Sequence, residues 1–219
     1  MTSPTLSTQC QTILAQGCQQ LGITLTEQQQ SLLLAYTEQL MKWNKAYNLT
    51  AIRQPEEMLK LHILDSLSVV QPVLEKQPKH LIDVGTGPGL PGMVLAIMLP
   101  EVNIDLLDTN GKKTRFLTHC KHLFKLDNVT VLNKRVEQHQ PPQPYDLVIS
   151  RAFASISDML TGCEQLVAEG GIFTPMKGQY PEDELAAMPT GFEVVDSQAL
   201  DVPFVDAERH ILTIKKIAK

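Results

Sequence analysis

The chain has 219 residues, of which 43% are hydrophobic and 20% are charged, and its formal net charge at pH 7 is −5. This composition is that of a globular protein with a sizeable core, built as one large domain or as one domain with a helical extension. No window is apolar over the length of a membrane span, and the four cysteines have no CxxC pairing, which favours reduced thiols in a cytoplasm over a zinc site.

The first 79 residues are predicted to form an all-helical extension. A helix over residues 6–21 ends at Gly22, since glycine suits the left-handed position that follows a helix. Thr26 then begins the sequence T-E-Q-Q, and the spacing of Thr26 and Gln29 is that of a capping box at the start of a long second helix. Pro55 suits the first turn of a third helix, which we expect to run towards residue 72.

Short apolar runs alternate with helical stretches after residue 79. Strands are predicted at residues 80–84, 103–108, 129–132, 145–150 and 171–176, with helices up to residue 98 and over 112–124 and 156–167 between them. This alternation predicts an α/β fold with a doubly wound, mostly parallel sheet. Two last runs, 193–200 and 210–217, predict an antiparallel hairpin at one edge. We therefore expect a domain over residues 80–219 beside a helical extension over residues 1–79.

The first strand runs into the glycine-rich segment LIDVGTGPGLPG, residues 81–92. From Gly87 this segment matches the dinucleotide-binding pattern G-x-G-x-x-G, but Gly85 already interrupts the strand before that pattern begins. The alternative frame, Gly85-x-Gly87-x-Gly89, follows the strand directly and opens a helix. Its backbone amides would face a cleft at the carboxyl edge of the sheet, so the segment predicts a cofactor loop.

Two acids at strand ends distinguish between cofactors. Asp83 lies at the end of the first strand, where dinucleotide sites usually have an apolar residue, and a carboxylate there suits a positively charged amino group. Asp108 ends the second strand, 23 residues after Gly85, and is placed to accept hydrogen bonds from both ribose hydroxyls. Asp108 fits NAD and S-adenosylmethionine equally, whereas Asp83 favours S-adenosylmethionine. A glycine turn without a ligand is less favoured, because the glycines coincide with two well-placed acids.

The charged residues are unevenly distributed. Seven Lys or Arg residues and one acid lie between residues 110 and 135, whereas eight acids and no Lys or Arg lie between residues 181 and 208. One part of the surface is therefore suited to a polyanion and another part repels it. Two merely solvated faces are an equally good interpretation of the charges alone.

Seven segments together carry a resemblance to one family. They are KWNKAYNLTAIR (42–53), HILDS (62–66), DVGTGPGLPG (83–92), LLDTNGKKTRFL (106–117), RVE (135–137), ISRAFAS (149–155) and ERHILTIK (208–215). Over nearly its whole length the chain resembles the bacterial glucose-inhibited division protein B family, methyltransferases that modify the N7 of a guanine in small-subunit (16S) ribosomal RNA. The resemblance implies a Rossmann-like class I S-adenosylmethionine-dependent methyltransferase in the cytoplasm. Its partner would be this RNA or the small ribosomal subunit, with neither a metal nor a membrane.

The resemblance also implies the cofactor contacts. They fall on Gly85 and Leu90 in the loop, on Val136 and Glu137 after the third strand, and on Arg151 after the fourth. Glu137 can accept a hydrogen bond from the adenine amino group, and Val136 offers an apolar face for the ring. With Asp83, Gly87 and Asp108 these residues form the predicted cofactor site.

Arg151 ends an apolar strand, so we expect its guanidinium to emerge into the cleft. The alternative is a salt bridge at the sheet edge to Asp83 or Asp108. Because the implied partner is ribosomal RNA, cations near the cofactor or at strand ends are the candidates for RNA binding. They are Lys112, Lys113, Arg115, Arg135 and Lys177.

The implied chemistry needs few catalytic groups. Guanine N7 carries a lone pair and no proton, so its methylation needs no general base, and catalysis is mainly alignment with electrostatic support. The fourth strand ends in S-R-A-F, not in the Asn/Asp-Pro-Pro-aromatic turn expected for methylation of an exocyclic amine. Cys120 and Cys163 are predicted to be core thiols of helices. We therefore assign no catalytic acid, base or nucleophile.

Other residues have more than one interpretation. His62 and Asp65 lie three apart on a predicted helix, where a buried hydrogen bond is favoured over a metal pair because no third ligand is evident. Trp43 is expected to pack the helical extension against the sheet, and the roles of Asn44 and Asn48 are open. Two rival functions are a small-molecule methyltransferase and a non-catalytic RNA-binding factor of ribosome assembly that senses the cofactor.

Overall fold

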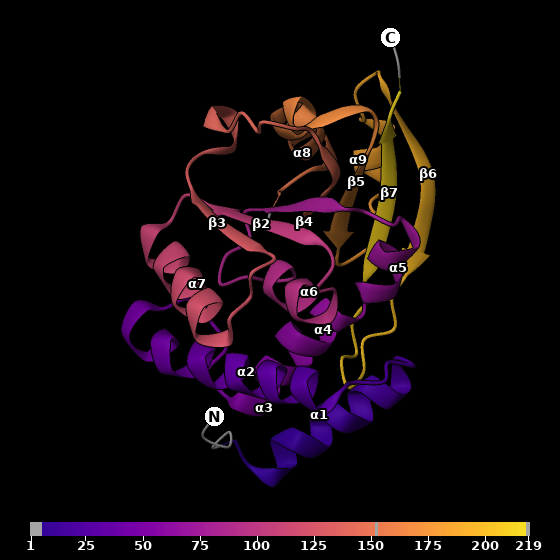
Figure 1. Cartoon of the computed structure of the whole chain (residues 1–219). Coiled ribbons are helices and arrows are strands. Elements are labelled where there is room, and N and C mark those ends of the chain that lie inside the picture. The colour runs from indigo at the N-terminus through magenta and orange to yellow at the C-terminus, as the bar shows by residue number, and fades with distance from the viewer. Residues whose placement is uncertain (1–5, 152, 218–219) are drawn as a thin grey trace.

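A seven-stranded sheet in the order β3-β2-β1-β4-β5-β7-β6 forms the centre of the protein (Figure 1). The structure is a computed structural model, and it describes residues 6–151 and 153–217. Strands β1 to β5 are parallel, β7 pairs antiparallel with β5, and β6 pairs antiparallel with β7. The strands are β1 (His80–Val84), β2 (Asn103–Asp108), β3 (Val129–Asn133), β4 (Tyr145–Ser150), β5 (Val167–Lys177), β6 (Phe192–Ala199) and β7 (His210–Lys216).

Helices cover both faces of this sheet (Figure 1). One face carries α6 (Gly92–Met98) and α7 (Gly111–Phe124), and the other carries α8 (Ile156–Cys163). The N-terminal elements are α1 (Thr8–Gln20), α2 (Glu27–Tyr47), α3 (Pro55–Met58), the π-helical η1 (Leu59–Leu64), α4 (Asp65–Leu67) and α5 (Val70–Glu75). The remaining short elements are η2 (Val136–Gln138), η3 (Glu164–Leu166) and α9 (Glu182–Ala186).

The predicted α/β topology is confirmed, including the antiparallel hairpin at one edge. Successive strand residues face opposite sides of a sheet, and the buried side chains accordingly separate into two cores. Leu81 and Ile149 belong to the core under α6 and α7, whereas Ile82 and Val148 belong to the core under α8. Both faces of the central strands are therefore buried, as expected for a parallel sheet covered by helices.

Two predicted helix ends were wrong. The helix expected over residues 156–167 ends at Cys163, because Val167 pairs with Tyr145 and already belongs to β5. The helix expected to stop near residue 72 contains a π-helical segment and continues as α5 to Glu75. Pro72 is compatible with α5 because it lies in the first turn, where a backbone N–H has no partner within the helix.

The signals for the first two helices are confirmed. Helix α1 is followed by Gly22 with φ +68°, and α2 begins with both hydrogen bonds of the Thr26–Gln29 capping box. The buried face of α2 reaches the glycine-rich segment, since the Tyr36 hydroxyl donates to the Pro88 carbonyl at 2.6 Å. Residues of both the helical extension and the sheet contribute to one hydrophobic core. The extension is thereby fixed against the segment that connects β1 to α6.

Helix α1 approaches the π-helical segment closely at Gly17. A Cβ at residue 17 would lie 2.5 Å from both Cδ atoms of Leu64, which is fully buried. We expect Gly17→Ala to lower the free energy of unfolding by about 1–2 kcal/mol, because overpacking outweighs the gain in helix propensity. Urea unfolding would measure this change.

The matched control for this prediction is Gln16→Ala on the exposed face of the same helix. That substitution also introduces alanine but meets no buried neighbour, so its effect should be neutral or slightly stabilising. Equal effects of the two substitutions would contradict the close contact between α1 and η1.

Candidate functional site

The glycine-rich segment forms a tight loop at the carboxyl edge of β1. Gly85, Gly87 and Gly89 have φ values of +69°, +62° and +104°, a region that favours glycine, so the frame that starts at Gly85 is the one the backbone uses. The amides of Gly85 and Thr86 both donate to the carbonyl of Leu107, at 2.8 and 3.1 Å. The loop is therefore hydrogen-bonded to β2 and leaves the edge of the sheet at a defined angle.

Asp83 supports this loop from beneath. Its Oδ2 accepts hydrogen bonds from the Thr86 hydroxyl at 2.7 Å and from the Gly92 amide at 2.8 Å. Its Oδ1 is buried and has no hydrogen-bond partner among the described residues. Burial raises the pKa of Asp83 to about 6, although both hydrogen bonds act in the opposite direction. The Asp83 side chain is fully buried, and it does not line the cavity that lies beside the loop, over β1, β2 and β3.

Asp108 lies at the carboxyl end of β2 and faces that cavity. Its Oδ2 accepts from the Gly87 amide and its Oδ1 from the Asn110 amide, both at 2.8 Å. The Lys113 ammonium lies 3.9 Å from Oδ2. A carboxylate has lone pairs for further donors, so Asp108 can still accept hydrogen bonds from a ligand in the cavity.

The cavity over β1, β2 and β3 has a volume of about 360 Å³. It is lined by Val84, Gly85, Leu107, Asp108, Thr109, Lys113, Arg135, Val136 and Glu137. Four residues of the predicted cofactor site meet here, namely Gly85, Asp108, Val136 and Glu137. Asp83, Gly87, Leu90 and Arg151 do not line it. Thr109 also lines the cavity and was not predicted, although its place directly after a strand-end acid would have indicated it.

Arg151 lines a second cavity, and its ion pair differs from the alternative of a salt bridge to Asp83 or Asp108. Its Nη1 is 2.9 Å from Oδ2 of Asp65, and it forms no ion pair with Asp83 or Asp108. The second oxygen of Asp65 accepts from Nε of Arg209, also at 2.9 Å. Residue 65 is 86 positions from Arg151 in the chain, so no local pattern could have indicated this pair.

The predicted hydrogen bond between His62 and Asp65 is wrong. Nε2 of His62 lies 2.7 Å from the Thr50 hydroxyl instead. A spacing of three residues aligns side chains on a regular α-helix, but residues 59–64 form a π-helical segment with a wider turn. Burial, and to a lesser degree the nearby Arg151 charge, lower the pKa of His62 to about 4.

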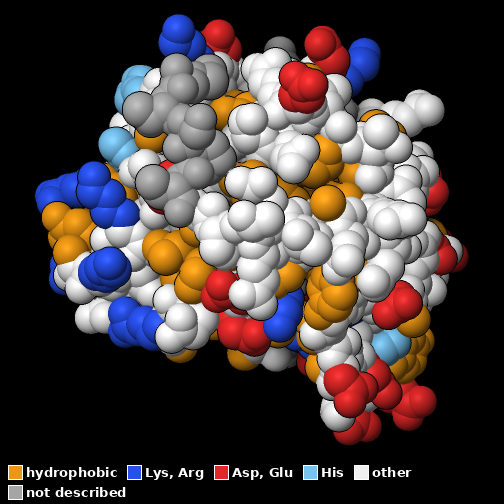
Figure 2. All heavy atoms as spheres, turned by 90° about the horizontal axis from the view of Figure 1, so that it is seen from below, with side chains coloured by type: hydrophobic (Ala, Val, Ile, Leu, Met, Phe, Trp, Pro, Cys, Tyr) orange, Lys and Arg blue, Asp and Glu red, His pale blue; other side chains and the backbone are white. Residues whose placement is uncertain are grey.

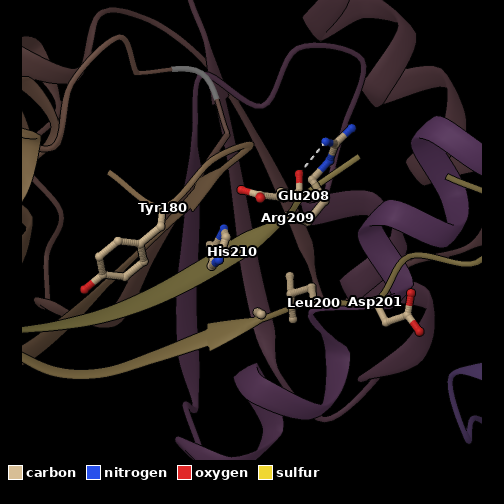
Figure 3. Close-up of a pocket in the computed structure, with 7 residues that line it drawn as sticks. Tyr180, Leu200, Asp201, Glu208, Arg209 and His210 are labelled. Atoms are coloured by element: carbon tan, nitrogen blue, oxygen red, sulfur yellow. Dashed lines mark hydrogen bonds between the residues drawn. The ribbon is translucent and has the colours of Figure 1, made fainter. Parts of the chain in front are cut away.

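The second cavity lies beyond the carboxyl ends of β4 and β5 and has a volume of about 470 Å³. It is lined by Leu61, Asp65, Arg151, Phe153, Met176, Lys177, Gly178, Leu200, Arg209 and His210. A third hollow of about 500 Å³ shares Leu200, Arg209 and His210 with it (Figure 3). In Figure 3 the Arg209 side chain extends away from Tyr180 and His210 and donates to the carbonyl of Glu208.

The candidates for RNA binding fall into three groups. Lys112 and Arg115 are exposed on the first turns of α7, and Lys113 and Arg135 line the cavity beside Asp108. Lys177 is paired with Glu184 at 2.7 Å. Figure 2 shows Lys and Arg gathered at the left of one face and Asp and Glu at its lower right, in line with the uneven charge distribution along the chain.

Trp43 packs the helical extension against the rest of the protein, but against α7 and not, as predicted, against the sheet. Its ring lies 5.6 Å from Phe116 and 5.2 Å from His119 between centroids. Asn44 is buried and donates to the Ile52 carbonyl, and Asn48 has φ +51° at the end of α2. These asparagines support the turn after α2.

Several other predictions concern absences. Among residues 6–151 and 153–217, no group of three or more His, Cys, Asp or Glu side chains is placed to hold a metal ion. No helix in that part of the chain is long and apolar enough to cross a membrane. All four cysteines are buried as free thiols, which confirms the prediction of core thiols.

Comparison with known proteins places this geometry in context. The sequence matches the family model described as rRNA small subunit methyltransferase G over residues 29–212. The ribosomal RNA small subunit methyltransferase G of Salmonella paratyphi B is 52% identical over 194 residues, which are 89% of this chain and 92% of that protein. The family match covers nearly all of α2, strands β1 to β6 and the beginning of β7.

Solved structures show the same fold at low sequence identity. TrmN from Thermus thermophilus aligns with a TM-score of 0.56 and 17% identity, over 73% of this chain and 53% of that one, so the chain spans about half of its length. TYW2 from M. jannaschii, in complex with AdoMet, aligns with a TM-score of 0.51 and 14% identity, over 66% and 76% of the two chains. The predicted Rossmann-like class I methyltransferase fold is confirmed.

The buried Asp83 carboxyl makes folding stability depend on pH. Its pKa of about 6 in the folded state is above the ordinary 3.8, so the folded protein binds this proton more tightly than the unfolded chain. This group therefore adds stability as the pH falls from about 7 to about 4, by roughly 2–3 kcal/mol in total. In urea unfolding, the difference in unfolding free energy between the wild type and Asp83→Asn should shift in favour of the wild type over this range.

The matched control for Asp83 is Asp127→Asn, which removes a carboxyl group at an exposed position. Loss of local hydrogen bonds in Asp83→Asn adds only an offset that does not vary with pH. A difference for Asp83→Asn that is constant between these pH values would contradict the burial of an ionisable carboxyl group.

Proposed function

The chain belongs to the rRNA small subunit methyltransferase G family, and we propose from this that it transfers a methyl group from S-adenosylmethionine to the N7 of a guanine in small-subunit (16S) ribosomal RNA. S-adenosylmethionine is its cofactor. The single observation that carries the proposal is the pair of adjacent cavities at one edge of the sheet. One has acceptors suited to an adenosine, and the other is lined by arginines and apolar side chains.

The residues around the first cavity fit this cofactor. Asp108 has acceptors for the ribose hydroxyls, and Glu137 on η2 has an acceptor for the adenine amino group. The apolar Val136 and Leu107 can contact the ring. Asp83 is proposed to favour the ammonium group of the cofactor. In support, its Oδ1 is a buried acceptor without a partner among the described residues. Gly87 and Leu90 would then act by shaping the loop.

The target base would occupy the second cavity. Strand β4 is the neighbour of β1, so this cavity adjoins the cofactor loop along the same edge. The Arg151 charge lowers the pKa of Asp83, although less than burial raises it, and this supports a position of the guanidinium close to the loop. Phe153 and Met176 offer apolar walls for a base. Arg151 would therefore lie between the cofactor and the target base.

The chemical step needs little from the protein beyond alignment. When bound, S-adenosylmethionine supplies an electrophilic methyl group on a sulfonium sulfur. Because guanine N7 has a lone pair and no proton, no side chain needs to remove one, and the protein contributes by orienting the base and excluding water. The guanidinium groups of the second cavity can hold the negatively charged RNA while apolar side chains contact the base.

The proposal extends to partner, location and domain organisation. Ribosomal RNA is the substrate, presented as naked RNA or in the small ribosomal subunit, and the protein acts in the cytoplasm. Residues 80–219 would form the methyltransferase domain and residues 1–79 a helical extension that borders the substrate. The two rival functions are less favoured, because the family match, over residues 29–212, includes most of the helical extension as well as most of the proposed methyltransferase domain.

Methyl transfer itself is the direct test. With labelled S-adenosylmethionine, small ribosomal subunits or their RNA should be labelled, and mass mapping should place the methyl group on guanine N7. Cofactor binding without transfer to either RNA form would support the assembly factor. Transfer to small molecules alone would support the small-molecule methyltransferase.

The exposed cations at the start of α7 are proposed to contact RNA phosphates. We expect the double substitution Lys112→Gln and Arg115→Gln to weaken RNA binding and to reduce the slope of log K against log salt by roughly 1–2. Lys113 is left unchanged, because its ammonium lies 3.9 Å from Asp108 in the cofactor cavity. Affinity for S-adenosylhomocysteine, measured by calorimetry, should not change.

The matched control is the double substitution Lys79→Gln and Lys215→Gln. It removes the same charge from two exposed positions at the amino-terminal edge of the parallel strands, opposite the cavities. If both double variants weaken RNA binding equally, the effect is one of net charge, and α7 is not the RNA-binding surface.

A further inference from the structure

Three distant segments of the chain meet at the carboxylate of Asp65. Asp65 begins helix α4, Arg151 follows β4, and Arg209 precedes β7. Each carboxylate oxygen accepts from one guanidinium, Oδ2 from Nη1 of Arg151 and Oδ1 from Nε of Arg209, both at 2.9 Å. Because both oxygens are engaged and the Asp65 side chain is only 3% exposed, the carboxylate has a single orientation.

Both guanidinium groups keep donors that this carboxylate does not use. Arg151 makes no other hydrogen bond to the described residues, and Arg209 donates once more, from Nη1 to the Glu208 carbonyl at 2.7 Å. The two side chains are 31% and 26% exposed, and both line the second cavity. Each guanidinium is therefore held at one end while its remaining N–H groups are accessible from the cavity.

The charges in this cavity do not cancel. Two guanidinium groups face one carboxylate. Among the described lining residues there is one further Lys, Arg, Asp or Glu, which is Lys177, and it is paired with Glu184. A buried ion pair is in general no more stabilising than apolar residues of similar volume, so stability alone does not account for a second arginine. An excess of accessible guanidinium donors suits an anion, and the planar fork of arginine matches a phosphate group.

We propose that Asp65 is a positioning residue, which holds Arg151 and Arg209 so that their remaining donors bind a phosphate of the RNA strand beside the target guanine. This inference rests on the proposed function, because it takes ribosomal RNA as the ligand. Asp65 itself does not touch the RNA. It acts through the two arginines, and it links the helical extension to the loops that border the second cavity.

The inference separates RNA affinity from turnover. Removal of the Asp65 charge makes the cavity more positive, so RNA binding should stay the same or become tighter. Turnover should fall, because the two guanidinium groups repel each other and no longer hold the strand in one alignment. A residue that only stabilised the fold would instead change the melting temperature and leave the kcat of the folded enzyme unchanged.

The experiment compares Asp65→Asn with Glu57→Gln. The control also removes one negative charge from the same helical region, but the Glu57 side chain is 47% exposed and pairs, among the described residues, with Lys60 alone. With wild-type methyl transfer to small ribosomal subunits as reference, kcat should fall by about 10- to 100-fold in Asp65→Asn and stay unchanged in the control. The Kd for RNA should not rise, and calorimetry should show that S-adenosylhomocysteine still binds.

A double-mutant cycle tests the route of action. If Asp65 acts through Arg209, the loss of kcat in the double variant Asp65→Asn/Arg209→Gln should be smaller than the product of the two single losses. If Asp65→Asn does not fold, Asp65→Glu replaces it, because it keeps the charge and moves the carboxylate by one methylene. The same fall in kcat with normal binding of RNA is then expected.

Three results would overturn the inference: an unchanged kcat in a folded Asp65 variant, weaker RNA binding that accounts for all the lost activity, or multiplicative effects in the cycle. Failure of the proposed function is distinguishable, since the wild type would then not methylate ribosomal RNA at all.

Discussion

The hydrogen bonds to the buried Asp83 carboxylate hold the turn from β1 into α6, and the first cavity, which we propose binds the cofactor, lies beside that turn. One oxygen of this carboxylate joins the Thr86 hydroxyl to the Gly92 amide, so the loop between them is closed over a fixed point. Gly92 must lack a side chain, because a Cβ there would lie 2.8 Å from Oδ2 of Asp83 and 2.3 Å from Leu106. The loop is therefore defined by one acceptor and by close packing beneath it.

The helical extension is part of the same construction. The hydroxyl of Tyr36 on α2 donates to the carbonyl of Pro88 in the loop. Asp65 of α4 forms ion pairs with Arg151, which follows β4, and with Arg209, which precedes β7. Both contacts end at the carboxyl edge of the sheet, where all five parallel strands deliver their loops. The extension thus lies against the cofactor loop through one contact and against the second cavity through the other.

Positive and negative side chains lie at different parts of this edge of the sheet. Cations lie beside Asp108 and at the start of α7, whereas the acids of α9 and its neighbours follow β5. Glu184 of α9 neutralises Lys177, so the guanidinium groups of Arg151 and Arg209 are the main positive charges over β4 and β5. A polyanion that reaches both cavities would therefore be attracted along α7 and repelled beyond α9.

Local sequence patterns predict the succession of strands along the chain, the first helices and some of the residues that line the first cavity. The periodicity after residue 79, the capping box at Thr26 and the frame of Gly85 are local signals, because strand pleating, helix capping and positive φ depend on residues within a few positions. Asp108 could be assigned for the same reason, since it ends a strand beside the loop.

The partners of the charged residues, in contrast, depend on the packing of segments that are far apart in the chain. Asp65 and Arg209 are 144 positions apart, and nothing local in either segment indicates that they share a carboxylate. The π-helical segment before Asp65 changed the face on which that side chain emerges, so the pairing predicted with His62 did not form. The sequence near Asp83 also does not indicate that its side chain is buried, because the burial depends on helices from other parts of the chain. Ion pairs and burial are set by packing between distant segments, and a local pattern carries no information on them.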